Sequence, residues 1–381
     1  MYFRTFDRPV WAEIDLAAIA HNIRELRRAT DPKAKLMAVV KANAYGHGAV
    51  RVSQVVLRHG ADYLGVAILE EARQLREAGI DAPILILGYT PAEQAADLVN
   101  LDITQTIYDY NTAAAISQAA VTRGKIAKVH IKVDTGMGRI GFASADTRTP
   151  QEILNIAGLP GLEIEGMFTH FAVAEAPNKD YTYWQYKQFM DLDSRLQQLG
   201  LHVSVKHSAN SAAILELPDI HLDMVRAGIS VYGLDPSHKV NRENINLRPA
   251  LSLKTRIAHV KTVPAGVSIS YGRTFTTARE SVIATIPVGY ADGYTRLLSN
   301  KTCVLAQGRR VPQIGNICMD QFMIDGTDLA ETVKPGDEVV LIGRQKEEEI
   351  TVDELAGLIG TINYEIVCMI SDRVPRVYIN E

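Results

Sequence analysis

A lysine that follows an apolar stretch and precedes a tyrosine and two glycines could do carbonyl chemistry. Residues 36–40 are apolar and predict a strand buried on both faces, with Lys41 at its carboxyl end. Partial burial disfavours the ammonium form of a lysine, and the neutral amine forms Schiff bases with carbonyl compounds. Tyr45, Gly46 and Gly48 add a phenol and backbone N–H groups where a phosphate could sit. The ordinary alternative is a strand-end lysine that stays solvated.

Groups that could bind anions recur later in the chain. Ser211 offers a hydroxyl to a phosphate, and Gly228 and Ile229 offer backbone N–H groups. Glycine at position 228 lets the backbone approach a ligand closely, although a plain turn there is the alternative. Arg139 could hold a carboxylate through two parallel hydrogen bonds.

His170 and Arg226 each have an ordinary and a chemical interpretation. A single histidine at a strand end is more often a hydrogen-bonded structural residue than a catalyst, and Arg226 could be an ion-pairing residue of the interior. Arginine does not give up its proton, so Arg226 would be a permanent cation in either case. The residue types alone leave both interpretations open.

Eight apolar stretches alternate with helical patterns and would position these groups. The predicted strands are 36–40, 63–67, 84–87, 103–107, 128–133, 162–169, 203–207 and 222–226, with helices after Asp15 and at 49–59, 69–78, 92–99, 112–123, 150–157, 181–199 and 211–217. Eight such units over about 230 residues match a (β/α)8 TIM-type barrel, whose active site lies at the carboxyl ends of its strands. Every chemical group named above follows such an end. The competing doubly wound sheet would carry a GxGxxG segment, which the chain lacks.

The pattern changes after position 236. Short strands separated by turns, at 251–260, 282–288, 302–306, 322–324, 338–342 and 374–379, predict a mainly β domain with one helix near 352–360. We place the first domain at 1–236 and the second at 237–381, and we expect that roughly the first 14 residues can pack with the second domain.

Composition excludes several classes of protein. The 381 residues, 47% of them hydrophobic, suffice for two domains with sizeable cores. A formal net charge of -4 offers no basic surface to nucleic acid, and no apolar run is long enough for a membrane span. Three cysteines without metal-ligand spacing predict neither a metal site nor a disulfide framework. The first ten residues lack the apolar core of a signal peptide, so we expect a soluble cytoplasmic protein.

Several motifs, in order along the chain, resemble the alanine racemase family. Residues 39–48 match that family's pyridoxal-phosphate lysine motif without a gap, and the resemblance runs from Trp11 to Arg376. It implies an isomerase that interconverts L-alanine and D-alanine by two-base α-proton exchange on a pyridoxal-phosphate aldimine, supplying D-alanine for peptidoglycan. The implied cofactor-binding residues are Lys41, Tyr45, His170, Asn210, Ser211, Arg226, Gly228, Ile229 and Tyr364.

The resemblance also implies a pair of catalytic bases, Lys41 and Tyr271. Lys41 would take the α-proton from D-alanine and Tyr271 from L-alanine. A free tyrosine loses its proton near pH 10, so Tyr271 would depend on a hydrogen-bonded chain through His170 and Arg226. Arg139 and the Met319 N–H would bind substrate, and the supporting residues would be Lys132, which is carbamylated in many family members, Asp320, Tyr290 and Arg296. The family forms head-to-tail homodimers with sites shared between subunits.

Two positions depart from the family pattern. Glu175 stands where aspartate is common, and Asn316 where arginine is common, both in the entrance corridor of the family. These departures concern substrate selectivity and rate more than reaction type. The alternatives are a broader amino-acid racemase, a decarboxylase on the same barrel, and a pyridoxal-phosphate carrier without turnover, although a carrier would need no Tyr271.

Overall fold

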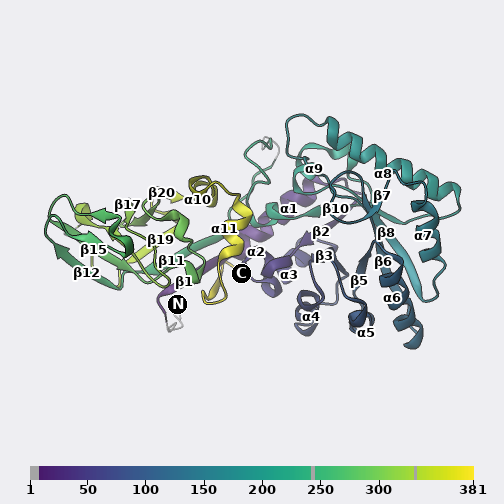
Figure 1. The fold of residues 1–381 in the computed structure, drawn as a ribbon, viewed down its shortest axis with the longest axis horizontal. Helices are drawn as coiled ribbons and strands as arrows, with labels where there is room; N and C mark the ends of the chain where they lie inside the picture. The colour runs from purple at the N-terminus through teal and green to yellow at the C-terminus, as the bar shows by residue number, and fades with distance from the viewer. Residues whose placement is uncertain (1–7, 242–244, 330–332) are drawn as a thin grey trace. The chain divides into compact units, whose positions relative to one another are not determined.

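The computed structural model describes residues 8–241, 245–329 and 333–381 and divides the chain into two compact units (Figure 1). The barrel unit comprises Ala18–Ala44 and Gly48–Pro249. The β unit comprises Met1–Ala17, Tyr45–His47 and Ala250–Glu381. Most of residues 1–10, where we found no signal-peptide pattern, lie outside the described residues.

The predicted (β/α)8 barrel is confirmed. Eight parallel strands pair in the order β10-β2-β3-β4-β5-β6-β8-β9. Backbone hydrogen bonds from Asp223 N to Lys206 O and from Arg226 N to Ala209 O link β10 to β9 and nearly close the ring. Their bounds are β2 Lys35–Val39, β3 Tyr63–Val66, β4 Ile84–Ile86, β5 Thr104–Ile107, β6 Ala127–Asp134, β8 Leu162–Phe168, β9 Val205–His207 and β10 Met224–Ala227. The two-residue β7, Phe142–Ala143, pairs with β6 beyond this ring.

Helices between the strands cover the barrel (Figure 1). Their apolar residues recur at helical spacing and are buried, as at Val52, Val55 and Val56 of α3. The bounds are α1 Leu16–Ala29, α3 Ala49–Arg58, α4 Leu69–Glu77, α5 Ala95–Asn100, α6 Tyr110–Thr122, α7 Thr149–Ala157, α8 Asp180–Gln198 and α9 Ser211–Glu216. Each predicted barrel helix therefore exists, with ends shifted by a few residues.

A long sheet forms the β unit, in the order β12-β15-β18-β17-β16-β19-β11-β1-β21. The bounds are β1 Val10–Asp15, β11 Leu251–Arg256, β12 His259–Val263, β15 Ser281–Ile286, β16 Cys303–Ala306, β17 Arg309–Ile314, β18 Phe322–Asp325, β19 Glu338–Gln345 and β21 Arg376–Ile379. β20, Glu348–Ile350, pairs with β19, and β13, Ser268–Ile269, pairs with β14, Phe275–Thr276. The first strand of the chain thus belongs to this sheet.

Among the described residues after β20, the β unit has two α-helices rather than one. α10, Val352–Ile359, is the predicted helix, and Thr351 caps it by accepting a hydrogen bond from Glu354 N. The second is α11, Asn363–Met369, so the prediction of a single helix was wrong. The predicted strand at 251–260 is likewise two strands, β11 and β12.

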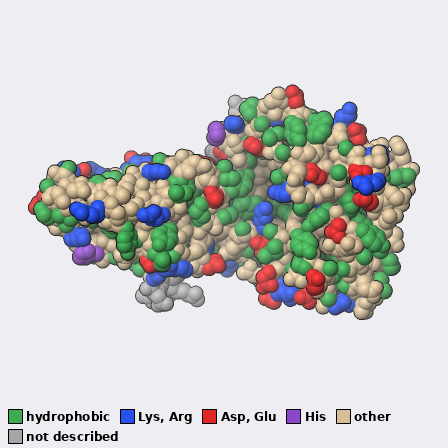
Figure 2. All heavy atoms as spheres, in the orientation of Figure 1, with side chains coloured by type: hydrophobic (Ala, Val, Ile, Leu, Met, Phe, Trp, Pro, Cys, Tyr) green, Lys and Arg blue, Asp and Glu red, His purple; other side chains and the backbone are tan. Residues whose placement is uncertain are grey.

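The surface carries charges of both signs. Figure 2 shows basic and acidic side chains interspersed over the visible face. Among the described helices, none is long and apolar enough to span a lipid bilayer. The described residues also contain no cluster of three or more His, Cys, Asp or Glu side chains suited to a metal ion.

Candidate active site

Directly after Lys41 the backbone makes a left-handed turn. Ala42, Asn43, Ala44 and Tyr45 have φ values of 52°, 52°, 53° and 50°, a region that residues other than glycine rarely adopt. Each such residue costs about 1–2 kcal/mol, so four in succession persist only where the surroundings hold them in place. No residue pattern in this segment predicted the turn.

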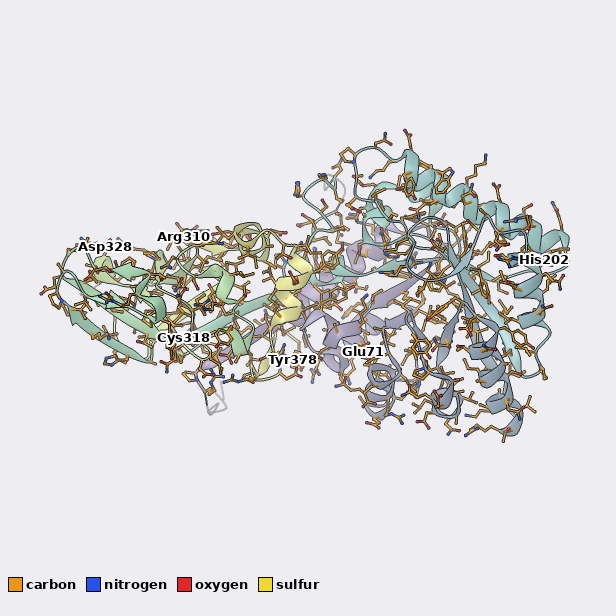
Figure 3. The ribbon with its side chains drawn as sticks, in the orientation of Figure 1. Glu71, His202, Arg310, Cys318, Asp328 and Tyr378 are labelled. Carbon is orange, nitrogen blue, oxygen red and sulfur yellow. The ribbon has the colours of Figure 1, made fainter. Side chains whose placement is uncertain are left out.

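A carboxylate ties the turn to the neighbouring strand. Glu71 of α4 accepts a hydrogen bond from the N–H of Ala42 at 2.6 Å, and its other oxygen accepts one from the N–H of Ala67 at 2.7 Å (Glu71 is labelled in Figure 3). Ala67 follows β3 and Ala42 follows Lys41, so one side chain links the carboxyl ends of β2 and β3. Glu71 therefore helps to fix the backbone that carries Lys41.

Asn43 and two glycines complete the turn. The carbonyl of Asn43 accepts a hydrogen bond from the N–H of Gly48 at 2.9 Å, and its side chain accepts one from the N–H of Ala49 at 2.8 Å. The Gly48 N–H is therefore engaged within the chain, and our expectation that it is available to a phosphate was wrong. At Gly46 a Cβ would lie 2.3 Å from Val367 O, so glycine is needed there for close packing within the β unit.

Two of the predicted cofactor-binding residues lie together in the β unit. The ring of Tyr45, 7% exposed, is 6.0 Å from the ring of Tyr364 between centroids, with a tilt of 54°. Arg376 fixes the segment after Tyr45, because its Nε donates to Gly46 O at 2.9 Å. Tyr364 comes from α11, the helix that the sequence did not predict.

Arg226 is buried inside the barrel at the end of β10. Its Nη1 donates to His207 Nδ1 at 2.9 Å, and its Nη2 donates to His170 Nδ1 at 3.1 Å and to two backbone carbonyl groups. Burial and the nearby Arg139 lower the pKa of Arg226 to about 9, which leaves it cationic at neutral pH. In the described residues no carboxylate contacts Arg226, so the alternative interpretation of Arg226 as an ion-pairing residue of the interior was wrong.

The two histidines bound to Arg226 are neutral. Burial, and then the charge of Arg226, lower the pKa of His170 and of His207 well below the usual value. Since Arg226 can only donate hydrogen bonds, the Nδ1 atoms of both histidines must accept them, which leaves each proton on Nε2. His170 is thus held by its hydrogen bond to Arg226, as the structural interpretation expects, and its Nε2–H is a hydrogen-bond donor.

The loops after β9 and β10 are joined by one hydrogen bond. The N–H of Gly228 donates to the hydroxyl of Ser211 at 2.8 Å, and Ile229 beside it is fully buried. Asn210 begins α9 by accepting a hydrogen bond from Ala213 N at 3.1 Å. Because Ser211 Oγ accepts from Gly228, its own proton is directed elsewhere and can be donated to a ligand.

Lys132 points into the barrel, whereas Arg139 is exposed. Lys132 is 3% exposed, and its Nζ donates to Val133 O at 2.7 Å. Burial, and then Arg226, lower the pKa of Lys132 to about 7. Arg139 follows a tight loop in which Asp134 accepts hydrogen bonds from backbone N–H groups. Much of Lys132 is therefore an uncharged amine at neutral pH.

The remaining predicted residues lie in the β unit. Tyr271 is 73% exposed, Met319 53% and Tyr290 43%, and Asp320 and Arg296 are exposed too. Exposure at this level leaves these side chains open to a ligand or to another chain.

Backbone contacts hold the Met319 segment. The N–H groups of Tyr290 and Ala291 donate to Cys318 O at 3.1 Å and Met319 O at 3.0 Å. A Cβ at Gly289 would lie 2.3 Å from Met319 O, so glycine is required for this contact. Asp320 pairs with Arg373 at 2.7 Å, which anchors the far side of the segment.

Sequence reasoning missed several residues of this arrangement. Glu71 was read only as part of a helix, and no sequence signal distinguishes it from other helix-surface carboxylates. His207 was given no role, although a histidine at the end of the predicted strand 203–207 was a usable signal. Asn316 was read as an entrance residue, yet its side chain contacts the backbone of Tyr271.

Comparisons with known proteins agree over the whole chain. Two family descriptions match, "Alanine racemase, N-terminal domain" at residues 14–236 and "Alanine racemase, C-terminal domain" at residues 250–378. An alanine racemase of Clostridium perfringens is 50% identical over 371 residues, covering 97% of this chain and 95% of that protein. One of Methanococcus maripaludis is 50% identical over 372 residues, covering 98% and 99%. The solved alanine racemase of Bacillus anthracis with bound L-Ala-P is similar with a TM-score of 0.92 and 42% identity, covering 98% of this chain and 96% of that one.

Proposed function

The chain belongs to the alanine racemase family and is an isomerase that interconverts L-alanine and D-alanine, and we propose that it does so with pyridoxal 5'-phosphate held at the carboxyl ends of the barrel strands. The arrangement of Arg226 carries this proposal. Its terminal nitrogens are held by two histidines and two carbonyl groups, while its Nε–H makes no hydrogen bond within the described residues. An unprotonated pyridine nitrogen is an acceptor that fits this donor.

The other donors fit the rest of the cofactor. Lys41, at the end of β2, would hold the aldehyde carbon. Ser211 has a hydroxyl proton to donate, and with the N–H of Ile229 it would hold the phosphate beside Gly228, whose own N–H is bonded to Ser211 Oγ. The remaining cofactor-binding residues would be Tyr45, His170, Asn210 and Tyr364. When bound, pyridoxal phosphate withdraws electrons from the α-carbon of the substrate and makes its proton acidic.

Arg226 would set the chemical selectivity. Because its guanidinium keeps its proton, it cannot protonate a pyridine nitrogen, and the ring would be a weaker electron sink than one facing a carboxylate. Arg226 would thereby disfavour reprotonation away from the α-carbon and limit transamination.

Two bases would exchange the α-proton on opposite faces of the substrate. Lys41 would remove it from D-alanine, and Tyr271 from L-alanine. Arg139 and the backbone N–H of Met319 would bind the substrate carboxylate. Asp320, Tyr290 and Arg296 would support the substrate side of the site.

A carbamate on Lys132 would turn a cation beside Arg139 into an anion that orients it. Carbamylation requires an uncharged amine, and the lowered pKa of Lys132 supplies one. Lys132 would then act as a positioning residue for Arg139.

We extend the proposal to a homodimer in which each site combines Lys41 of one chain with Tyr271 of the partner subunit and Met319 of the partner subunit. The exposure of both residues in the β unit supports this arrangement. We further propose that the D-alanine product supplies peptidoglycan synthesis. The three cysteines are free, which is typical of the reducing cytoplasm.

The test is incubation of the pure protein with L-alanine in D2O, following optical rotation and the α-proton signal together. A racemase loses both, a decarboxylase releases carbon dioxide, and a carrier changes neither. Loss of rotation without exchange of the α-proton would contradict the two-base proposal. Repeating the assay with L-serine distinguishes a broader racemase.

A further inference from the structure

Five side chains form a continuous hydrogen-bonded chain through the barrel interior. It begins at His170 and Arg226, at the carboxyl ends of the strands, and passes from Arg226 Nη1 to His207 Nδ1 at 2.9 Å. His207 Nε2 then meets His130 Nδ1 at 2.9 Å, and His130 Nε2 meets Glu165 Oε2 at 3.2 Å. The hydrogen-bonded chain therefore connects the site described above with the carboxylate of Glu165 in β8, which lies beside Lys128 near the start of β6.

The direction of every hydrogen bond in this chain follows from its two ends. Arg226 only donates, so the proton of His207 lies on Nε2 and is donated to His130 Nδ1. The proton of His130 then lies on Nε2 and is donated to Glu165, which as a carboxylate only accepts. Burial alone would raise the pKa of Glu165, but hydrogen bonds from His130, Lys128 and Tyr63 outweigh it and lower that pKa. Every hydrogen bond from Arg226 to Glu165 is therefore donated in the same direction, from the cation toward the anion. We call this chain of hydrogen bonds the relay.

Glu165 contacts His130 at an irregularity in β8. Val129 pairs with Ile164 and His130 with Gly166, so β8 has one extra residue, Glu165, at this point. Side chains alternate between the faces of a regular strand, and a bulge redirects one of them. The extra residue lets both Glu165 and Gly166 lie beside the His130 ring.

The His130 ring fits beside β8 because residue 166 is a glycine. A Cβ on Gly166 would lie 2.5 Å from the His130 ring. His130 and His207 are fully buried, and the ring of Phe168 stacks on His207 at 4.6 Å between centroids. The central part of the relay is therefore dry, where an unpaired polar group is costly and each hydrogen bond is strong.

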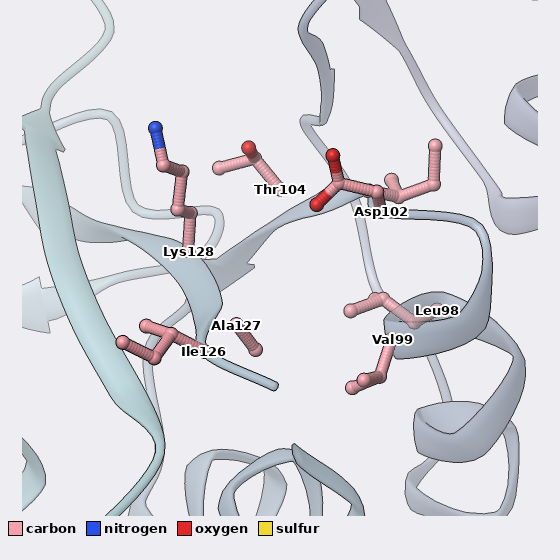
Figure 4. Close-up of a pocket in the computed structure, with 8 residues that line it drawn as sticks. Leu98, Val99, Asp102, Thr104, Ile126, Ala127 and Lys128 are labelled. Atoms are coloured by element: carbon pink, nitrogen blue, oxygen red, sulfur yellow. The ribbon is translucent and has the colours of Figure 1, made fainter. Parts of the chain in front are cut away.

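The Glu165 end of the relay is open to water. Its side chain is 12% exposed and pairs with Lys128 at 2.7 Å. Lys128 and Asp102 are the charged residues that line a small pocket at the starts of β5 and β6 (Figure 4). The anionic end of the relay is thus partly exposed, whereas Arg226 at its other end is buried.

We propose that Glu165 is a positioning residue, which fixes the proton positions of His130 and His207 and through them the orientation of the Arg226 guanidinium. Its effect on catalysis rests on the proposed function, because it acts through the role of Arg226 toward the cofactor. The proton positions themselves do not depend on that role.

The primary test reads those protons in the full-length protein, by neutron diffraction from perdeuterated crystals and by 15N NMR of histidine-labelled protein. Wild type is expected to carry both protons on Nε2. A proton on Nδ1 of either His130 or His207 would overturn the proposal, and this measurement requires no variant.

Three variants then test the consequence for catalysis. Glu165→Gln keeps an oxygen acceptor but removes the charge, and its amide can also donate, so we expect mixed protonation sites on His130 and about a tenfold lower kcat at unchanged KM. Gly166→Ala displaces the His130 ring and should have a similar effect. Glu163→Gln removes the same charge from an exposed position of β8 and should match wild type.

Two results would count against the inference or the function separately. If Glu165→Gln keeps wild-type proton positions and wild-type kcat, the inference fails. If wild type does not racemise alanine, the proposed function fails, while the proton positions still decide the inference.

Discussion

The side-chain amide of Asn316 donates a hydrogen bond to the backbone oxygen of Tyr271 at 2.6 Å. The backbone of Asn316 in turn accepts one from the Ser270 hydroxyl at 2.6 Å. Asn316 therefore holds the turn that presents the proposed second base, although the sequence had placed it only in an entrance corridor.

We expect Asn316→Ala to lower kcat for alanine about three- to tenfold, because the Tyr271 turn loses a hydrogen bond worth about 1 kcal/mol. The values of kcat/KM for the two directions must fall equally, since the two directions share one equilibrium constant. Asn316→Asp cannot donate to a carbonyl and should behave alike. A changed preference for serine over alanine at unchanged kcat would show that Asn316 acts only on substrate entry.

Lys41→Ala should abolish racemisation and the visible absorption of the bound cofactor, because no other group at the end of β2 can form the Schiff base. The measurement is an absorption spectrum with a parallel assay. Lys35→Ala, at the exposed start of the same strand, is the control and should keep both. Retained absorption in Lys41→Ala would remove Lys41 from the mechanism.

Ser211→Ala should weaken retention of the cofactor about tenfold, because the phosphate loses one donor and Gly228 loses its acceptor. Equilibrium dialysis against pyridoxal phosphate measures this effect. Ser230→Ala is the matched control, since the hydroxyl of Ser230 is buried and has no hydrogen-bond partner among the described residues. Equal effects of the two substitutions would exclude Ser211 from the phosphate site.

Lys132→Met should stabilise the fold most at neutral and lower pH. The folded pKa of Lys132, about 7, lies below its ordinary value of 10.5, so between these values the unfolded chain binds more protons than the folded one. The cost of burying the ammonium is therefore full below pH 7 and fades as the pH rises toward 10.5. Each pKa unit corresponds to about 1.4 kcal/mol.

Urea unfolding in CO2-free buffer measures this effect. The difference in the free energy of unfolding between Lys132→Met and wild type should be on the order of a few kcal/mol at pH 7 and should shrink by pH 10. A difference that does not depend on pH would mean that Lys132 is not a buried titrating amine.

Mixing Lys41→Ala with Tyr271→Phe protein should restore activity if subunits share sites. Random exchange makes about half of the dimers mixed, and each mixed dimer holds one intact site, so about a quarter of wild-type activity should return. Mass spectrometry confirms the exchange. Complete exchange without recovery would show that each chain builds its site alone.

The barrel was predictable because its signal is local and repeated. Stretches such as 36–40 are apolar on both faces, as parallel strands under helices require, and the structure places each within a few residues of the prediction. The positions of chemical groups at strand ends followed from the topology alone.

Elements without local signals were missed. β1 alternates buried and half-buried residues but lies in a polar segment. β17 contains Pro312, which argues against a strand. α11 begins at Asn363 after the N-cap residue Ile362, which offers no side-chain cap, so no start signal precedes Tyr364. Glu165 contacts His130 where β8 carries one extra residue, and this pairing irregularity depends on two strands and cannot be read from one.

The chain's first described strand pairs with its last. β1 lies between β11 and β21, with Ala12 beside Arg376. During synthesis at about 5–20 residues per second, β1 leaves the ribosome on the order of tens of seconds before β21 exists. An unpaired strand edge invites association with other chains during that interval. β1 therefore lacks its β21 partner throughout synthesis of the barrel, and we expect nascent chains to be most prone to associate through that strand.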